Sequence, residues 1–208
     1  MKDCRISKAL VPALLFSAVL AGCSGQQAPP QAAAAPAETA ATSSAVNMSG
    51  SFDGWRQLGS ANWTIENGEF VATMGTGMLV TQDTYTDFRI TLEFFVDSGK
   101  ANSGVFLRAS NPDEIAETNA YEVNIFDERP DQTGRTGAIV RFAPASQAIN
   151  AAGQWNTYDI TAQGDHLVVV FNGVTTVDTH DSTYASGPIA LQYGAGEVRF
   201  RNVKIERL

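Results

Sequence analysis

The chain has 208 residues, of which 44% are hydrophobic and 17% charged, which excludes a disordered, collagen-like or coiled-coil protein and leaves room for one ordinary domain. The formal net charge of −8 argues against nucleic-acid binding, because proteins that bind a phosphate backbone usually present a basic face. Both cysteines, Cys4 and Cys23, precede the region expected to fold, so that region has no disulfide and no thiolate for catalysis, and we expect no metal site of the usual His-rich or Cys-rich kind.

Residues 1–22 have the pattern of a signal peptide. Basic residues precede the apolar stretch Ala9–Ala21, which is too short to span a bilayer permanently. The run Leu20-Ala21-Gly22-Cys23 resembles the lipobox of bacterial lipoproteins. That resemblance implies cleavage before Cys23, lipidation of its thiol and a lipid-anchored protein of the bacterial cell envelope, at the outer membrane because Ser24 and not an aspartate follows. The alternative is an ordinary secretory signal that happens to contain a cysteine.

Residues 23–49 are expected to be a tether between the lipidated cysteine and the folded domain. Positions 26–46 contain nine alanines, three prolines and a single charged residue, Glu38. Such a segment buries too little apolar surface to offset the entropy of ordering it. We therefore expect the folded domain to occupy residues 50–208.

Within residues 50–208 the apolar residues recur with period two, which predicts strands rather than helices. In Phe88–Val96 every second residue is apolar, as in a long strand with one face in the core. Asn172-Gly173 between two apolar runs predicts a tight hairpin. Further strands are expected at 69–74, 104–109, 120–126, 137–142, 156–162, 166–171, 174–178, 188–193 and 197–206. These elements predict an all-β fold, a two-sheet antiparallel jelly-roll sandwich of the concanavalin A-like or laminin G-like type.

A set of short motifs in chain order resembles the 3-keto-disaccharide hydrolase domain family. They are Ala101–Arg108, Tyr121–Asp127, Gly153–Asn156, Gly187–Gln192 and Val198–Ile205. The resemblance implies a concanavalin A-like jelly roll with a sugar cleft on its concave sheet. It also implies cleavage of glycosides already oxidised to a ketone at C3. Apart from the resemblance, a divalent cation is the one candidate cofactor.

A C3 ketone acidifies the C2 proton, so a base can remove that proton and the C1 leaving group can be eliminated before water adds. The reaction needs a base, donors for the developing enolate and an acid for the leaving group. Glu122, Asp127 and Arg108 are the ionisable candidates for these catalytic roles inside the matching motifs. Each has a plainer interpretation: a solvated strand residue for Glu122, a loop residue for Asp127, and a salt-bridge partner of Glu122 for Arg108.

Strand alternation predicts where these side chains point. Glu122 is expected on the face opposite Val123 and Ile125, which look like core residues, so it should project into the cleft. By the same alternation Arg108 should share a face with Phe106. Asp127 has the parity of the core residues and can join Glu122 only if it lies beyond the strand end.

Four further residues are candidate substrate-binding groups: Asn102, Asn124, Trp155 and Gln192. Asn102 also fits turn chemistry, and Trp155 also fits packing. A separate cluster, Asp178, His180 and Asp181, is a candidate for cation binding, although both histidines, His166 and His180, also fit ordinary surface positions.

The chain departs from the family pattern at three positions. Asn124 stands where many members have glutamine, Val140 where a tyrosine is frequent, and Tyr193 where a histidine usually follows. Loss of that histidine removes the most obvious base at neutral pH. Three function classes therefore remain: an enzyme acting on 3-keto-glycosides, a lectin-like carbohydrate-binding lipoprotein without catalysis, and a structural lipoprotein without a small ligand.

Overall fold

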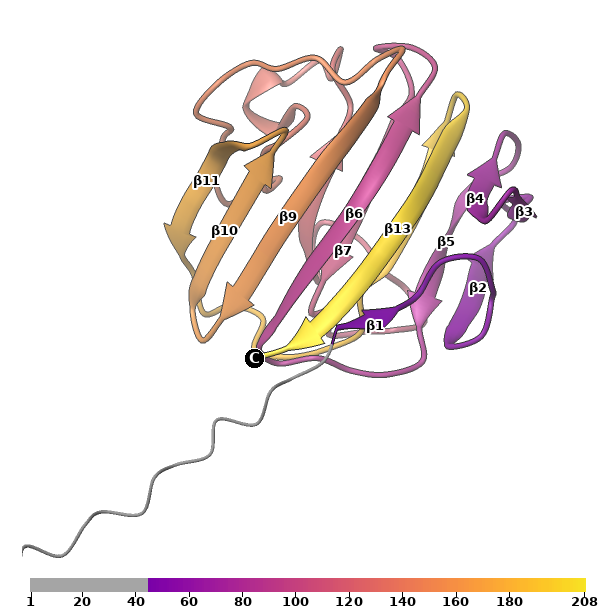
Figure 1. Cartoon of the computed structure of the whole chain (residues 1–208). Coiled ribbons are helices and arrows are strands. Elements are labelled where there is room, and N and C mark those ends of the chain that lie inside the picture. The colour runs from indigo at the N-terminus through magenta and orange to yellow at the C-terminus, as the bar shows by residue number, and fades with distance from the viewer. Residues whose placement is uncertain (1–44) are drawn as a thin grey trace, which may run out of the picture. The chain divides into compact units, whose positions relative to one another are not determined.

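The structure is a computed structural model that describes residues 45–208 (Figure 1). The expected signal peptide, the lipidation site Cys23 and almost all of the expected tether lie outside the described residues. Within residues 45–208 no helix has the length and apolar character needed to cross a membrane.

The larger of two sheets has eight strands and faces the viewer in Figure 1. Its strands in spatial order are β11 (Val174–His180), β10 (His166–Phe171), β9 (Trp155–Gln163), β6 (Phe88–Val96), β13 (Val198–Arg207), β4 (Glu69–Ala72) and β3 (Thr64–Glu66), with β1 (Val46–Asn47) also paired to β13.

The smaller sheet has five strands and lies behind the first. Its order is β2 (Trp55–Gly59), β5 (Gly77–Thr81), β12 (Ala190–Ala195), β7 (Asn102–Leu107) and β8 (Tyr121–Ile125). One short 3-10 helix, η1 (Gln132–Gly134), follows β8. The paired strands of both sheets are antiparallel, which confirms the predicted all-β jelly-roll sandwich.

The core lies between the two sheets. Strand β6 alternates strictly between buried and more exposed positions, and its buried residues Phe88, Phe94 and Val96 belong to the main apolar cluster. Phe94 packs on Tyr158 of β9 with ring centroids 4.7 Å apart. The predicted hairpin at Asn172-Gly173 is confirmed: the two residues connect β10 to β11 with φ angles of 49° and 80°.

Two differences from the predicted elements have physical reasons. The expected strand at 137–142 is wrong, because Gly137 (φ 86°) and Arg141 (φ 70°) leave the extended region and only isolated bridges at Ile139 remain. Strand β1 pairs with β13 at Val46–Asn47, ahead of residue 50, where we expected the domain to begin. Pairing with a long partner strand lets two residues join the sheet without an apolar pattern of their own.

Candidate functional site

The outer face of the five-stranded sheet carries three of the five family-like motifs side by side. Gly104 of β7 pairs with Gln192 of β12 on one side and with Asn124 of β8 on the other. In the neighbouring register row, Phe106 pairs with Ala190 and with Glu122. Three segments far apart in the chain therefore contribute to one surface.

Glu122 projects from this face as alternation predicted, since Val123 and Ile125 belong to the core between the sheets. Its side chain is only 5% exposed. Burial raises the pKa of the Glu122 carboxyl to about 7, opposed by the positive charge of Arg129 and reinforced by the negative charge of Glu117. No hydrogen bond from the described residues holds this carboxyl group. It is a buried acid whose hydrogen-bonding capacity remains free.

Because Gly104 has no side chain, it leaves room for the Glu122 carboxyl. A side-chain carbon at Gly104 would lie 3.3 Å from Glu122 Oε1 and 3.2 Å from the Val123 carbonyl oxygen. The carboxyl therefore leans over the glycine, into space that any larger residue would crowd.

On the other side of Gly104 lies a hollow of about 500 Å³. Asn102, Gln192, Asp113 and Ile115 are among its lining residues. The Gln192 Oε1 atom is buried and has no hydrogen-bond partner among the described residues. Two of the four predicted substrate-binding residues, Asn102 and Gln192, thus line one hollow, and Gly104 separates it from Glu122.

The connection between β7 and β8 covers part of this face. Ile115 packs with Phe106 in a small apolar cluster on the outer side of the sheet. Asp113 forms an ion pair of 3.1 Å with Arg56, and Glu117 one of 3.1 Å with Arg129. These two ion pairs link the connection to Arg56 of β2 and to Arg129 after β8.

Arg108 lies elsewhere, and the expectation that it shares a face with Phe106 is wrong. Its φ of 53°, one residue after β7 ends, breaks the strand alternation. The buried guanidinium donates from Nε to the Thr86 carbonyl (2.8 Å) and from Nη1 to the Gly164 carbonyl (2.7 Å), and it pairs with Asp87 at 3.3 Å. Burial lowers the pKa of Arg108, and Asp87 raises it. Arg108 therefore ties loops together and does not meet Glu122.

Asp127 does lie beyond the end of β8, but it turns away from Glu122. Its Oδ1 accepts a hydrogen bond from the Thr136 hydroxyl (2.6 Å), and its Oδ2 accepts from the backbone N–H groups of Ala151 (2.8 Å) and Ala152 (3.1 Å). Asp127 is 8% exposed, and with three donors on its carboxylate it holds two loops together.

Asn124 shares the outer face with Glu122 but is fully buried. Its amide nitrogen donates to the Gly134 carbonyl, and its Oδ1 accepts from the N–H of Ile125. The side chain is used in fixing the segment around η1, so the structure does not leave it free to contact a substrate.

Trp155 lies on the other sheet and does not join the site. It pairs with Phe95 on β6, and the Arg201 guanidinium lies 3.8 Å from the centre of its ring. The packing interpretation of Trp155 fits this position better than sugar stacking beside Glu122.

The proposed cation cluster at Asp178, His180 and Asp181 is also separated in the structure. Asp181 Oδ1 accepts from the Tyr121 hydroxyl at 2.6 Å, whereas His180 contacts Asp165. In residues 45–208 no three His, Cys, Asp or Glu side chains are arranged to hold a metal ion.

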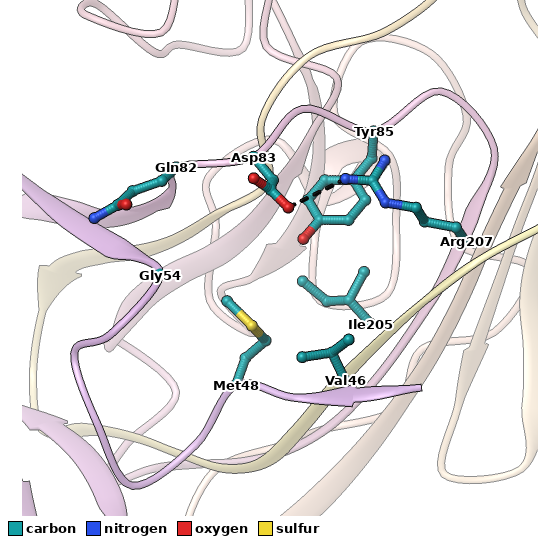
Figure 2. A pocket seen from close by; sticks show the side chains of 8 residues that line it. All are labelled: Val46, Met48, Gly54, Gln82, Asp83, Tyr85, Ile205 and Arg207. Carbon is teal, nitrogen blue, oxygen red and sulfur yellow. Dashed lines mark hydrogen bonds and ion pairs between the residues drawn. The ribbon is translucent and has the colours of Figure 1, made fainter. Parts of the chain in front are cut away.

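A second hollow, of about 380 Å³, lies beside β1 and the end of β13 (Figure 2). Asp83 and Arg207 form an ion pair of 3.2 Å in it, and the guanidinium lies 4.3 Å from the centre of the Tyr85 ring. Because these charges already satisfy each other, this hollow is a weaker candidate for chemistry than the face with Glu122. None of its lining residues was a sequence-based candidate for catalysis or binding, although Ile205 stands in the Val198–Ile205 motif.

Sequence reasoning also missed Arg129 and Glu117, the charges that act on the pKa of Glu122. Both lie in polar segments around β8, where a sequence gives no sign of which charge faces the strand. Gly104 stood inside a quoted motif, but its lack of a side chain was not recognised as a feature of the site.

Similar solved structures have the same fold. A protein from Parabacteroides distasonis described as a candidate glycosyl hydrolase is 18% identical, with a TM-score of 0.68 over 76% of this chain and 89% of that chain. A second candidate glycosyl hydrolase from that organism is 24% identical, with a TM-score of 0.62 over 74% and 99%. The carbohydrate binding module CBM66 from Bacillus subtilis is 17% identical, with a TM-score of 0.60 over 74% and 95%.

No curated protein matches the chain. The profile of the 3-keto-alpha-glucoside-1,2-lyase-like domain matches residues 44–206, which include both sheets and the face with Glu122. This match confirms the resemblance drawn from the motifs and supports a carbohydrate-related function. The chain therefore belongs to the family of 3-keto-alpha-glucoside-1,2-lyase-like domains.

Proposed function

We propose that this protein cleaves 3-keto-glycosides, with Glu122 as the base that removes the C2 proton. The observation that carries the proposal is the Glu122 carboxyl itself, which is buried, free of hydrogen bonds from the described residues and has a pKa of about 7. Family membership supports this substrate class. The names of the similar structures, two candidate glycosyl hydrolases and a carbohydrate binding module, agree with a sugar ligand.

The proposed reaction has two steps. In the first, the C2–H bond breaks, its proton passes to Glu122, and the electron pair forms an enolate with the C3 ketone. The enolate then expels the C1 substituent, which takes a proton from water as it leaves, and a C1–C2 double bond conjugated to the ketone remains; the resulting hydroxide and the proton on Glu122 are the groups that add in the second step. In the second step water adds across this bond, with hydroxyl at C1 and hydrogen at C2, and gives the free 3-keto sugar.

The raised pKa of Glu122 suits this role. A general base works best when its pKa lies near the working pH, because it is then deprotonated often enough and still basic enough to take a proton. A fully solvated glutamate would be a weaker base by more than two pKa units. Burial of the carboxyl beside Gly104 is therefore the feature that makes Glu122 suited to C2 deprotonation.

Gln192 and Asn102 are the proposed sugar-binding groups. Both line the hollow next to Gly104, and the side-chain oxygen Oε1 of Gln192 has no partner among the described residues. A sugar hydroxyl is a donor that matches such an oxygen. Arg108 and Asp127 have no part in this proposal, since their side chains are already bonded within the fold.

The direct test is release of sugar by the purified full chain from a 3-keto-disaccharide, compared with the unoxidised parent disaccharide. We expect release only from the keto substrate, because only a C3 ketone acidifies the C2 proton. Deuterium at C2 should slow the reaction if proton removal limits its rate. Equal release from both sugars would contradict the mechanism.

A carbohydrate-binding function without catalysis is favoured by one observation. Both histidines of the chain lie on β10 and β11 of the other sheet, so no imidazole accompanies Glu122. Binding of ordinary oligosaccharides with no turnover of keto substrates would establish this second function in place of the first.

We also propose that the protein acts as a lipoprotein of the bacterial cell envelope, anchored at Cys23 in the outer membrane. The support is the lipobox-like run before Cys23. Replacement Cys23→Ser should release the chain into the soluble fraction without changing the melting temperature, because the thiol precedes the matched domain. Retention of the variant in the membrane pellet would contradict the proposal.

A further inference from the structure

The only two histidines of the chain face each other at the edge of the eight-stranded sheet. His166 is the first residue of β10 and His180 the last of β11, and the two are register partners at the open end of this hairpin. Their rings are stacked with centroids 4.6 Å apart and planes inclined by 9°. In Figure 1 these strands form the outermost pair of the sheet.

Each ring is held by a carboxylate through one nitrogen only. The Asp178 Oδ1 atom lies 2.7 Å from Nε2 of His166, and the Asp165 Oδ1 atom lies 3.0 Å from Nδ1 of His180. A carboxylate can only accept, so in the neutral imidazole the nitrogen facing it carries the hydrogen. The lone pairs then lie on His166 Nδ1 and His180 Nε2, for which the described residues supply no partner.

We propose that His166 and His180 form a surface site for one divalent transition-metal ion of the zinc, nickel or copper type. Neutral imidazole is a preferred ligand for these ions, and a carboxylate on the second ring nitrogen is the usual arrangement around a metal-bound histidine. A zinc ion bonds each nitrogen at roughly 2.0–2.1 Å, so two rings whose centres lie 4.6 Å apart are close enough to share one ion.

The parallel rings must turn for their lone pairs to meet, because each lone pair lies in the plane of its ring. The side chains are exposed enough to do so, at 42% for His166 and 65% for His180, and both aspartates are more than half exposed and free to follow. No third ligand is arranged nearby in residues 45–208. The site therefore supplies two ligands and leaves the remaining positions on the metal to water.

A bound metal ion would link β10 and β11 at the open end of the hairpin, opposite the Asn172-Gly173 turn. Binding to the folded state alone stabilises that state by mass action. A melting temperature that rises with Zn²⁺ is therefore a second readout, independent of any glycoside-cleaving activity and of the site on the other sheet.

The experiment is a titration of the full chain with Zn²⁺, followed by the ¹⁵N signals of the histidine rings. Because the chain has two histidines, both sets of signals are assigned by single variants. We expect both rings to respond together with saturation at one ion, through Nδ1 of His166 and Nε2 of His180. Single variants His166→Asn and His180→Asn should each bind at least about tenfold more weakly, because the second ligand no longer acts at high effective concentration.

Two controls complete the test. The double variant His166→Asn/His180→Asn measures binding elsewhere in the chain, including the thiols of Cys4 and Cys23. Asp178→Ala should weaken zinc binding by about tenfold while leaving both ligands in place. Ring signals that do not respond, a response of one ring alone, or single variants that bind as tightly as the wild type would each overturn the proposal.

Discussion

Two buried carboxyl groups lie five residues apart in the chain, and the fold treats them in opposite ways. Asp127 accepts three hydrogen bonds, from Thr136 and the backbone of Ala151 and Ala152. Glu122 accepts none from the described residues, and burial raises its pKa to about 7. Both residues were candidates for the same chemistry, although strand alternation directed only Glu122 to the cleft face.

This difference distinguishes a carboxylate that stabilises the fold from one that is available to take part in a reaction. Hydrogen bonds from three donors occupy the lone pairs of a carboxylate and hold it within the fold, away from a substrate. Burial without donors destabilises the charged form, which costs folding free energy and leaves the oxygens free to take a proton. Glu122 has this second character, and Asp127 has the first.

The largest expected effect is on turnover by Glu122→Gln. The variant keeps the volume of the side chain but loses the base, so the rate on a 3-keto-disaccharide should fall by about 10²–10⁴-fold. Binding of the keto sugar should change far less, and the circular dichroism spectrum should match the wild type. Near-normal turnover in this variant would show that Glu122 is not the base.

Among the variants considered, Asp127→Ala should lower the stability of the fold most. Its loss leaves three donors, two of them buried, without their charged acceptor, and we expect the free energy of unfolding to drop by about 4 kcal/mol. Urea unfolding followed by tryptophan fluorescence measures this drop. Turnover per folded molecule should stay close to the wild-type value, and a selective loss of turnover at unchanged stability would mean that the two carboxyl groups have been assigned the wrong way round.

The pH dependence of stability tests the raised pKa of Glu122 directly. Folded wild type holds the proton up to about pH 7, whereas the unfolded chain releases it near the ordinary value of 4.5. The stability tied to this proton is therefore fully present below pH 4.5 and lost as the pH rises through 7. Relative to the wild type, Glu122→Gln should gain stability between pH 4.5 and 8.5, by at most about 3 kcal/mol. An equal difference at both pH values would contradict the shift.

The smallest expected effect concerns the charges around Glu122. Arg129 lowers the pKa of Glu122 and Glu117 raises it. Arg129→Met should therefore move the acidic limb of the pH–rate profile to higher pH, and Glu117→Gln should move it to lower pH, each by less than about one unit. Shifts of the same sign in both variants would mean that they act through the shape of the connection and not through charge.

The fold followed from the sequence wherever alternation was uninterrupted. Strands β6 and β10 and the Asn172-Gly173 hairpin were predicted because period two and a turn pair are local signals. For the same reason the outward direction of Glu122 was predicted correctly.

The site was less predictable, because its features depend on non-local structure or on single backbone angles. The positive φ of Arg108 reversed the side chain that alternation placed beside Phe106. The sequences of β7 and β9 do not reveal that these strands belong to different sheets. Trp155 was therefore grouped with Asn102, although the two residues lie in different sheets. The donors on Asp127 come from residues 136 and 151–152, far from it in sequence.

The edge strand β11 also affects whether one copy of the domain associates with another through its sheet edge. An edge strand exposes unpaired N–H and C=O groups that can pair with another sheet and start aggregation. The pairing of β10 with β11 shifts register between Val169 and Val170, and Asp178 and His180 project from the outer strand. A register irregularity and charged or polar side chains are both known to discourage such pairing. Removing Asp178 should therefore make the domain more prone to form intermolecular β-sheet at high concentration.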